Sequence, residues 1–184
     1  MGCILSVLEK IVALFLFGMF WPIMAICALK IKSEAPGPFI FRQKRLGLGQ
    51  KEFVLFKIRS MPIGGPRQPT LFGRWMRSHG LDELAQLINV MKGDMSLIGP
   101  RPIQQSELHR FFQNHRDKKE DLEKFFAWRS SVRPGITGSH QVIANVQTDD
   151  FESLQQNDKK QISIQDCFVS FLIPFLGKER FYRK

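Results

Sequence analysis

The segment Ile11–Leu29, IVALFLFGMFWPIMAICAL, contains no charged residue and decides which class of fold this sequence can adopt. As a straight helix it would be roughly 28 Å long, close to the thickness of the hydrocarbon layer of a membrane. Apart from Gly18 and Pro22, all of its residues are apolar or aromatic. These residues would lie on all sides of the helix rather than along one stripe, which argues against a core helix of a soluble domain. A cleaved signal peptide is not expected, because no basic region precedes the segment and no small-residue cleavage site follows it.

Pro22 lies near the middle of this segment, where it removes a backbone hydrogen bond and predicts a kink or a break. Two arrangements follow: a tilted single span, or a re-entrant hairpin that enters and leaves the membrane on one side. The residues alone favour the span. Basic residues are concentrated after the segment, so this flank is predicted to be cytoplasmic. They are Lys30, Lys32, Arg42, Lys44 and Arg45.

The overall composition fits a basic protein of 184 residues, enough for one domain, with a net charge of +10 and a pI of about 9.9. Such a protein attracts nucleic acid, anionic lipid or phosphorylated metabolites. Its three cysteines lie far apart and its four histidines form no metal motif, so neither a disulfide framework nor a metal-ligand cluster is expected from them. Nothing in the sequence specifies an oligomeric state.

After the apolar segment, residues 38–61, PFIFRQKRLGLGQKEFVLFKIRSM, predict a β-hairpin. Aromatic and polar residues alternate in its first half, Phe53–Ile58 forms a second β-rich run, and Gly47 and Gly49 supply the turn. Residues 62–69 are rich in glycine and proline and predict a loop.

Further along, three apolar patterns with helical spacing predict helices, one of them over Leu81–Met91. The other two contain Leu108, Phe111 and Phe112, and Leu122, Phe125 and Phe126. They flank the charged run 115–121, HRDKKED, which predicts a solvated helix face. Residues 131–138, SVRPGITG, predict a turn. The tail 167–184, CFVSFLIPFLGKERFYRK, suits either an interfacial helix on anionic lipid or a core helix with a basic end.

Candidate chemistry is concentrated in Gly80–Pro102, GLDELAQLINVMKGDMSLIGPRP, which opens with adjacent carboxylates. Asp82 and Glu83 stand at a predicted helix start, and on spacing alone a capping role is favoured. Several arginines near glycine, proline or loop residues could grip phosphate oxygens in pairs. Carboxylates beside such arginines suggest Mg²⁺, and a carboxylate can also attack phosphorus. A phosphoryl-transfer site at a membrane surface is therefore a second hypothesis. The arginines are Arg59, Arg74, Arg77, Arg101 and Arg133.

Three stretches that follow an apolar segment with a central proline carry a family resemblance. They are GPFIFRQKRLGLGQKEFVLFKIRSM, LDELAQLINVMKGDMSLIGPRP and RPGITGSHQV. In this order they resemble the bacterial sugar transferases, and more narrowly the small monotopic phosphoglycosyl transferases, over about residues 5–145. Each stretch alone is a weak signal, whereas the combination is specific.

The resemblance implies transfer of a sugar-1-phosphate from a UDP-sugar to a polyprenol phosphate such as undecaprenol phosphate, with Mg²⁺ as cofactor and UMP as product. This would be the first membrane step of glycan assembly. It implies Asp82 as the nucleophile that forms a covalent phospho-aspartate intermediate. Glu83 would be its partner, either at the metal or assisting the acceptor, and Asp82 is the other candidate metal ligand. It implies phosphate contacts by Arg77 and Arg101, to which the arginine-rich pattern adds Arg59 and Arg133.

The resemblance also implies an α+β, mostly helical fold on the cytoplasmic face of the bacterial inner membrane. A re-entrant membrane helix broken at Pro22 (residues 1–32) would precede one catalytic domain (residues 33–184). A small hairpin and short amphipathic interfacial helices would surround the active site. This monotopic arrangement replaces the simple span, and the chain is expected to be a minimal catalytic unit without the additional N-terminal spans of larger members.

Three positions depart from the family pattern: Trp21 replaces a frequent serine before the proline, and Gly80 and Ala85 replace serine and proline around the carboxylates. The loss of the serine at position 80 is expected to weaken capping.

Two other functions stay open, a catalytically inactive membrane-anchored scaffold and a module that binds anionic lipid or nucleic acid. Nucleic acid is not expected, because no nucleic-acid-binding motif is present. No residue specifies the sugar.

Overall fold

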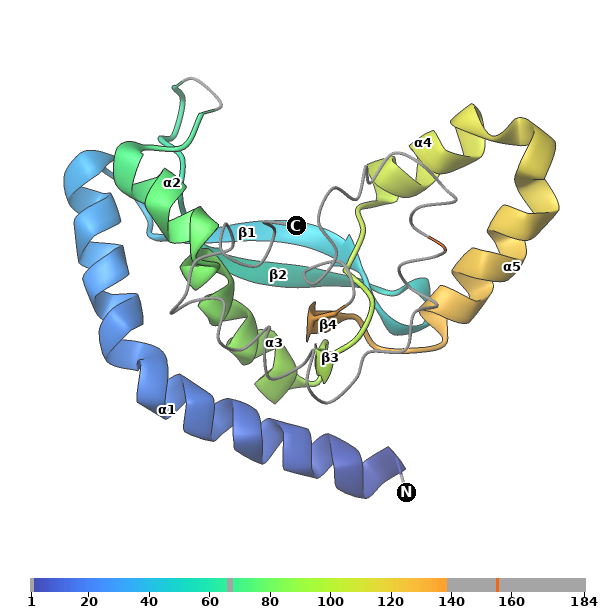
Figure 1. The fold of residues 1–184 in the computed structure, drawn as a ribbon, viewed down its shortest axis with the longest axis horizontal. Helices are drawn as coiled ribbons and strands as arrows, with labels where there is room; N and C mark the ends of the chain where they lie inside the picture. Colours follow the sequence, from blue (N-terminus) through green and yellow to red (C-terminus); the bar gives the residue numbers. More distant parts are fainter. Residues whose placement is uncertain (1, 66–67, 139–154, 156–184) are drawn as a thin grey trace, which may run out of the picture. The chain divides into compact units, whose positions relative to one another are not determined.

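The computed structural model describes residues 2–65, 68–138 and 155, and Figure 1 shows the course of the chain. Helices predominate over strands in these residues, which confirms a mostly helical α+β composition. The elements are α1 (Gly2–Glu34), β1 (Ile40–Leu46), the 3₁₀ turn η1 (Leu48–Gln50), β2 (Glu52–Ile58), α2 (Leu71–Ser78), the 3₁₀ helix η2 (Leu81–Gln86), α3 (Leu87–Lys92), β3 (Ser96–Ile98), α4 (Gln105–Asn114), the 3₁₀ turn η3 (Arg116–Lys118), α5 (Lys119–Ser130) and β4 (Gly135–Thr137).

The described residues form two compact units, and each is considered by itself. The first contains the residues up to Gln43 together with Leu55–Gly93. The second contains Lys44–Val54 and the residues from Asp94 onward. The predicted division of the chain into a membrane segment and a catalytic domain is defined by position relative to the membrane, whereas these two units are defined by contacts between residues. The predicted division therefore stays a prediction.

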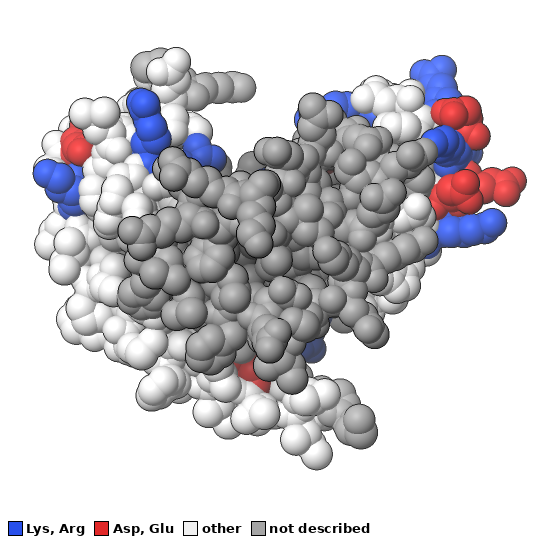
Figure 2. Space-filling model, in the orientation of Figure 1, with Lys and Arg blue, Asp and Glu red and all other residues white. Residues whose placement is uncertain are grey.

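Helix α1 is the long apolar element that the sequence predicts. It continues through Pro22, and Figure 1 shows it changing direction along its length, as expected of a kink rather than a break. Residues Ile4–Glu34 have the length and apolar composition to cross a membrane. Figure 2 shows an almost uncharged surface over most of the helix, with charged side chains near its C-terminal end. Its exposed large apolar residues include Ile11, Leu14, Phe15, Met19, Trp21, Ile26 and Leu29. The choice between a re-entrant and a spanning arrangement stays a prediction.

The predicted hairpin is confirmed. Strands β1 and β2 pair in one two-stranded sheet, with η1 as the connection. Near one end the Arg59 amide donates to the Phe39 carbonyl, and at the other the Gly47 amide donates to the Lys51 carbonyl, so the strands are antiparallel. Gly49 has a φ of 64°, which accounts for a glycine in this turn.

The core of the first unit joins α1 to the elements that follow the hairpin. Cys27 of α1, Ile58 of β2 and Met76 of α2 are buried together with two residues of η2, Leu81 and Ala85. Helix α2 begins after Thr70, whose hydroxyl accepts a hydrogen bond from the Gly73 amide (2.9 Å). This packing places the short helix η2 directly against the apolar helix α1.

The core of the second unit is formed mainly by α4 and α5, the two helices predicted from their apolar spacing. Their buried residues include Leu108, Phe111, Leu122, Phe125 and Phe126. A capping box formed by Gln104 and Glu107 starts α4. The charged run between the helices is largely exposed, as predicted, and Figure 2 shows basic and acidic side chains intermixed there.

Residues 131–138 were predicted to form a turn, and this prediction is wrong for Gly135–Thr137, which form strand β4. It pairs in parallel with β3, with Ser96 opposite Gly135 and Ile98 opposite Thr137. The pairing brings two backbones into unusually close contact at Gly99 and Gly135. A Cβ atom built on Gly135 would lie 2.0 Å from the Gly99 nitrogen, so the crossing requires glycine. The predictions for the tail 167–184 lie outside the described residues.

Candidate active site

The turn that carries the two carboxylates begins at Gly80, which has a φ of 69° and lies in the left-handed region that favours glycine. The Gly80 amide donates to the Arg77 carbonyl (3.1 Å), and its own carbonyl accepts from the Glu83 amide (3.1 Å). Gly80 occupies the N-cap position of η2, with Asp82 and Glu83 in the first turn. Glycine therefore fits the backbone at a position where the sequence pattern led us to expect weakened capping.

The two carboxylates have different surroundings. Asp82 is 6% exposed, between the buried residues Leu81 and Ala85. Glu83 is half-buried and accepts a hydrogen bond and ion pair from Lys57 of β2 at 3.1 Å (Nζ to Oε1). Lys57 therefore places a positive charge beside the carboxylate turn. Lys57 was not among the predicted site residues, although a lysine within the apolar strand run FVLFKI is a visible signal.

Asn89 anchors the helix that follows the turn. Its side chain is completely buried, and its Oδ1 accepts a hydrogen bond from the Phe56 amide of β2 (3.0 Å). A buried amide of this kind stabilises only when it is paired, so Asn89 fixes α3 relative to the strand that carries Lys57. The carboxylate turn is thus held between α1, α2 and β2.

The Asp82 and Glu83 carboxylates fit Mg²⁺ as ligands in number and in chemistry, because this ion commonly takes one or two carboxylates with water and substrate phosphate. Among the described residues no group of three or more His, Cys, Asp or Glu side chains could hold a metal. The site therefore lacks the residues for an all-protein cage, and Lys57 already occupies one oxygen of Glu83.

Two of the predicted phosphate-binding arginines belong to the same unit as the carboxylates. Arg77 is exposed in the last turn of α2. Arg59 is 5% exposed and its guanidinium donates to the carbonyls of Ala35 and Pro36, just after the end of α1 (3.2 Å to Pro36). These contacts satisfy carbonyl groups at a helix end, which is a structural role. A phosphate contact by either arginine stays a prediction.

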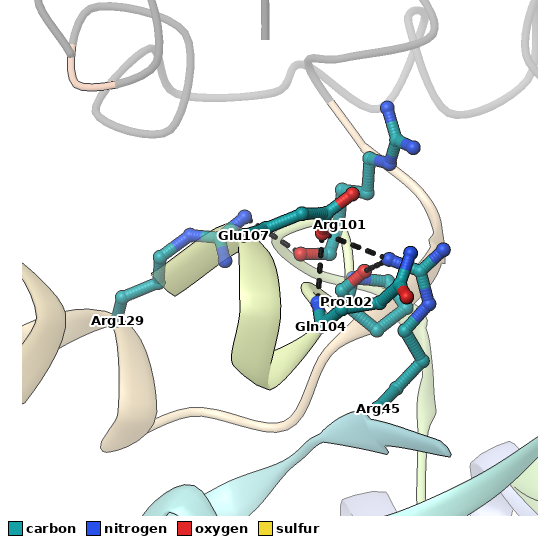
Figure 3. Close-up of polar contacts among 6 residues, drawn as sticks. All are labelled: Arg45, Arg101, Pro102, Gln104, Glu107 and Arg129. Atoms are coloured by element: carbon teal, nitrogen blue, oxygen red, sulfur yellow. Dashed lines mark hydrogen bonds and ion pairs between the residues drawn. The ribbon is translucent and has the colours of Figure 1, made fainter. Parts of the chain in front are cut away.

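The other two predicted arginines, Arg101 and Arg133, belong to the second unit. Figure 3 shows the Arg101 side chain directed away from the hydrogen bonds made by the backbone around it. Arg101 also lines a small cavity of about 30 Å³ together with the buried Arg129. Arg133 lies between α5 and β4, where its carbonyl faces Gly99.

The backbone around Arg101 is held by successive carbonyl groups. Pro100 O accepts from the Gly135 amide (3.0 Å) and Ile103 O accepts from the Leu46 amide (2.8 Å). Between them, Arg101 O accepts from Arg129 (2.6 Å) and Pro102 O accepts from Arg45 (3.0 Å). Four consecutive carbonyls therefore have donors from three different parts of the chain.

Glu107 connects this network to helix α4. Its carboxylate accepts from Arg45 (3.0 Å) and from the Gln104 amide (2.7 Å) (Figure 3). Burial lowers the pKa of Arg45, Glu107 opposes this effect, and the nearby charge of Arg101 adds to it. From the sequence, Arg45 was predicted only as part of the basic flank of α1, and Glu107 and Arg129 were not predicted as site residues.

The family model described as bacterial sugar transferase matches residues 2–175 of this chain. A UDP-glucose:undecaprenyl-phosphate glucose-1-phosphate transferase of Caulobacter vibrioides is 39% identical over 147 residues, which cover 74% of this chain and 52% of that protein. An enzyme with the same name from Xanthomonas campestris is 38% identical over 146 residues, 73% of this chain and 28% of its own length.

A UDP-N-acetylgalactosamine-undecaprenyl-phosphate N-acetylgalactosaminephosphotransferase of Aeromonas hydrophila is 38% identical over 151 residues, 76% of this chain and 33% of its own length. The chain thus spans about half or less of the length of these relatives. Their names contain two different sugars and the same lipid acceptor.

Proposed function

Because the chain belongs to the bacterial sugar transferase family, we propose that it transfers a sugar-1-phosphate from a UDP-sugar to undecaprenyl phosphate and releases UMP. The named relatives act on UDP-glucose or UDP-N-acetylgalactosamine, and they support this general reaction. The proposed enzyme works at the cytoplasmic face of the inner membrane, in keeping with the basic residues that follow the apolar segment.

The packing of η2 against α1 is the observation that carries the proposal. Leu81 and Ala85, which flank Asp82, are buried with Cys27 of the apolar helix. A carboxylate at this position would lie beside the membrane-associated element, where a water-soluble donor and a lipid-linked acceptor can both arrive. A two-step reaction lets the two anionic substrates bind in turn at one small site.

In the first step, one oxygen of the Asp82 carboxylate attacks the β-phosphorus of the UDP-sugar. The bond from that phosphorus to the bridging oxygen breaks, and the oxygen leaves with its electron pair as part of UMP. In the second step, a phosphate oxygen of undecaprenyl phosphate attacks the same phosphorus, and the bond to Asp82 breaks. The aspartate is regenerated and an undecaprenyl diphosphate sugar is formed.

The other residues supply charge and position. Asp82 and Glu83 would hold Mg²⁺, which when bound neutralises charge on the phosphate oxygens. Lys57 restrains Glu83 through their 3.1 Å ion pair. Arg77 and Arg101 are proposed to bind the phosphates, since a guanidinium can pair with two phosphate oxygens at once.

Substitution of Asp82 by Asn tests the nucleophile. Asparagine has nearly the same shape as aspartate, and the N-cap of η2 is Gly80 rather than residue 82, so the variant is expected to fold and to remain membrane-bound. It cannot form an acyl phosphate, so UMP release from a panel of UDP-sugars with undecaprenyl phosphate should be lost. Wild-type protein incubated without acceptor should retain label from a donor labelled in its β-phosphate, whereas the variant should retain none.

Exposed Asp121 of α5 provides a matched control, because Asp121→Asn makes the same chemical change at a position outside the carboxylate turn. This variant should release UMP and trap label as the wild type does. Turnover by Asp82→Asn at a tenth of the wild-type rate or more would exclude Asp82 as the nucleophile, with Glu83 the next residue to test. No UMP release by the wild type with any UDP-sugar would instead favour an inactive scaffold.

A further inference from the structure

Each of the four carbonyl groups of Pro100–Ile103 accepts a hydrogen bond, and two of the four donors are arginine side chains. Both prolines lack an amide hydrogen and have a fixed φ, so the segment cannot use their nitrogens to pair with a strand. The carbonyl groups of the segment therefore accept hydrogen bonds from donors in other parts of the chain. Arg45, from β1, and Arg129, from α5, provide donors to the two central carbonyls.

These two arginines are unusually well buried for a basic protein. Arg45 is 7% exposed and Arg129 is 6% exposed. Burying a cation is costly unless its hydrogen bonds are satisfied, and a guanidinium can satisfy several acceptors in one plane where a lysine cannot. The ion pair with Glu107 (3.0 Å) compensates part of the cost for Arg45.

The side chain of Arg101 is directed away from this network (Figure 3). Its backbone is therefore fixed while its guanidinium stays apart from the carbonyls that hold the segment. We propose that Arg45 and Arg129 are positioning residues, which clamp the Pro100–Ile103 backbone so that the Arg101 guanidinium is pre-organised for a phosphate of the nucleotide sugar. This inference deepens the proposed function and rests on it.

A double-mutant cycle between Arg129 and Arg101 tests the clamp. The assay is equilibrium dialysis of UDP against the detergent-solubilised full chain, which does not require turnover. Arg129→Met removes the donor and keeps an unbranched, shorter side chain, and it is expected to raise the Kd of UDP at least tenfold. In the Arg101→Ala background the same substitution should change Kd less than twofold, because there is no guanidinium left to position.

Thermal stability provides the readout that separates positioning from general stabilisation. The carbonyl of residue 101 is retained in Arg101→Ala, so Arg129→Met should lower Tm by the same amount in both backgrounds while its effect on Kd depends on Arg101. Arg129→Lys should recover part of the affinity. Arg116→Gln, at an exposed position of η3, removes a positive charge in the same unit and should leave Kd unchanged.

Equal increases in Kd in the two backgrounds would overturn the proposal, and so would an increase of less than twofold in the wild-type background. If Arg129→Met does not fold, the cycle is run with Arg129→Lys, and failure of both variants to fold would assign Arg129 to structure alone. A wild-type chain that neither binds UDP nor releases UMP would refute the proposed function instead, which keeps the two failures distinct.

Discussion

Replacement of Gly135 by alanine should disrupt the pairing of β3 with β4. The added Cβ would lie 2.0 Å from the Gly99 nitrogen and 2.6 Å from the Ile98 carbonyl carbon, whereas ordinary van der Waals contact begins at 3.4 Å. Both neighbours are backbone atoms, so no side-chain rotation can relieve the overlap. The two strands would have to separate.

Three backbone hydrogen bonds join the two segments near Gly135. They join Ser96 to Pro134 (2.8 Å), Gly99 to Thr137 (3.0 Å) and Gly135 to Pro100 (3.0 Å). At about 0.5–1.5 kcal/mol each, their loss would cost about 3 kcal/mol. A whole domain is stable by only about 5–15 kcal/mol, so this is a large fraction. For a chain of this size the expected decrease in Tm is about 6–12 °C.

The assay is thermal unfolding of the solubilised protein together with UMP release. Because Pro100 directly precedes Arg101, loss of the Gly135 contact should also lower activity at temperatures where the variant is folded. Gly18→Ala is the matched control: its Cβ meets nothing within 4 Å, and alanine is favoured over glycine within a helix. A Gly135→Ala protein with the wild-type Tm and rate would refute the close approach of the two backbones.

Three further predictions concern the proposed site and the membrane segment. Arg101→Lys keeps the charge but loses the planar fork, so kcat/KM for the UDP-sugar should fall at least tenfold, and near wild-type kcat/KM would exclude a role for the fork. Lys57→Met removes the ion pair that competes with a metal for the Glu83 carboxylate, so the Mg²⁺ concentration for half-maximal UMP release should decrease several-fold, and an unchanged value would exclude Glu83 as a metal ligand. Gly2→Cys and Lys32→Cys, each in a chain without native cysteines, should both react with a membrane-impermeant reagent only after the cells are lysed, whereas labelling of position 2 in intact cells and of position 32 only after lysis would demonstrate a span.

Elements with a strong local pattern could be predicted from the sequence. The uniform apolar run predicts α1, because the pattern extends over many residues and needs no partner to define it. Alternation with glycines at the turn predicts the hairpin, since its two strands are neighbours in sequence. The i, i+3, i+4 spacing of Leu108, Phe111 and Phe112 predicts α4 for the same reason.

Elements that depend on distant contacts could not be predicted in this way. Strands β3 and β4 have three residues each, too short for a periodic pattern, and they are separated in sequence by both α4 and α5. The glycine and proline residues around position 135 are typical of a turn, and only the approach of Gly99 explains why a strand forms there.

The same limit applies to the candidate site. Asp82 and Glu83 are adjacent, so a motif can identify them. Arg45 and Arg129 are far apart in sequence, and in a chain with 27 lysines and arginines each is typical of an ordinary surface charge. Their importance depends on burial and on the carbonyls they reach, which are properties of the folded chain.

The long separation of β3 from β4 has a consequence for the order in which the chain is made. Synthesis proceeds from the N-terminus, and segments that need only earlier residues can fold first. The turn containing Asp82 packs on α1, α2 and β2, all of which precede it or lie close to it in the chain. The segment that holds Arg101 requires Arg129, at the end of α5, and Gly135, which follows that helix, so both emerge from the ribosome later. A nascent chain therefore has α1, α2 and β2, the described elements that pack on its carboxylate turn, well before it has the groups that hold its arginine.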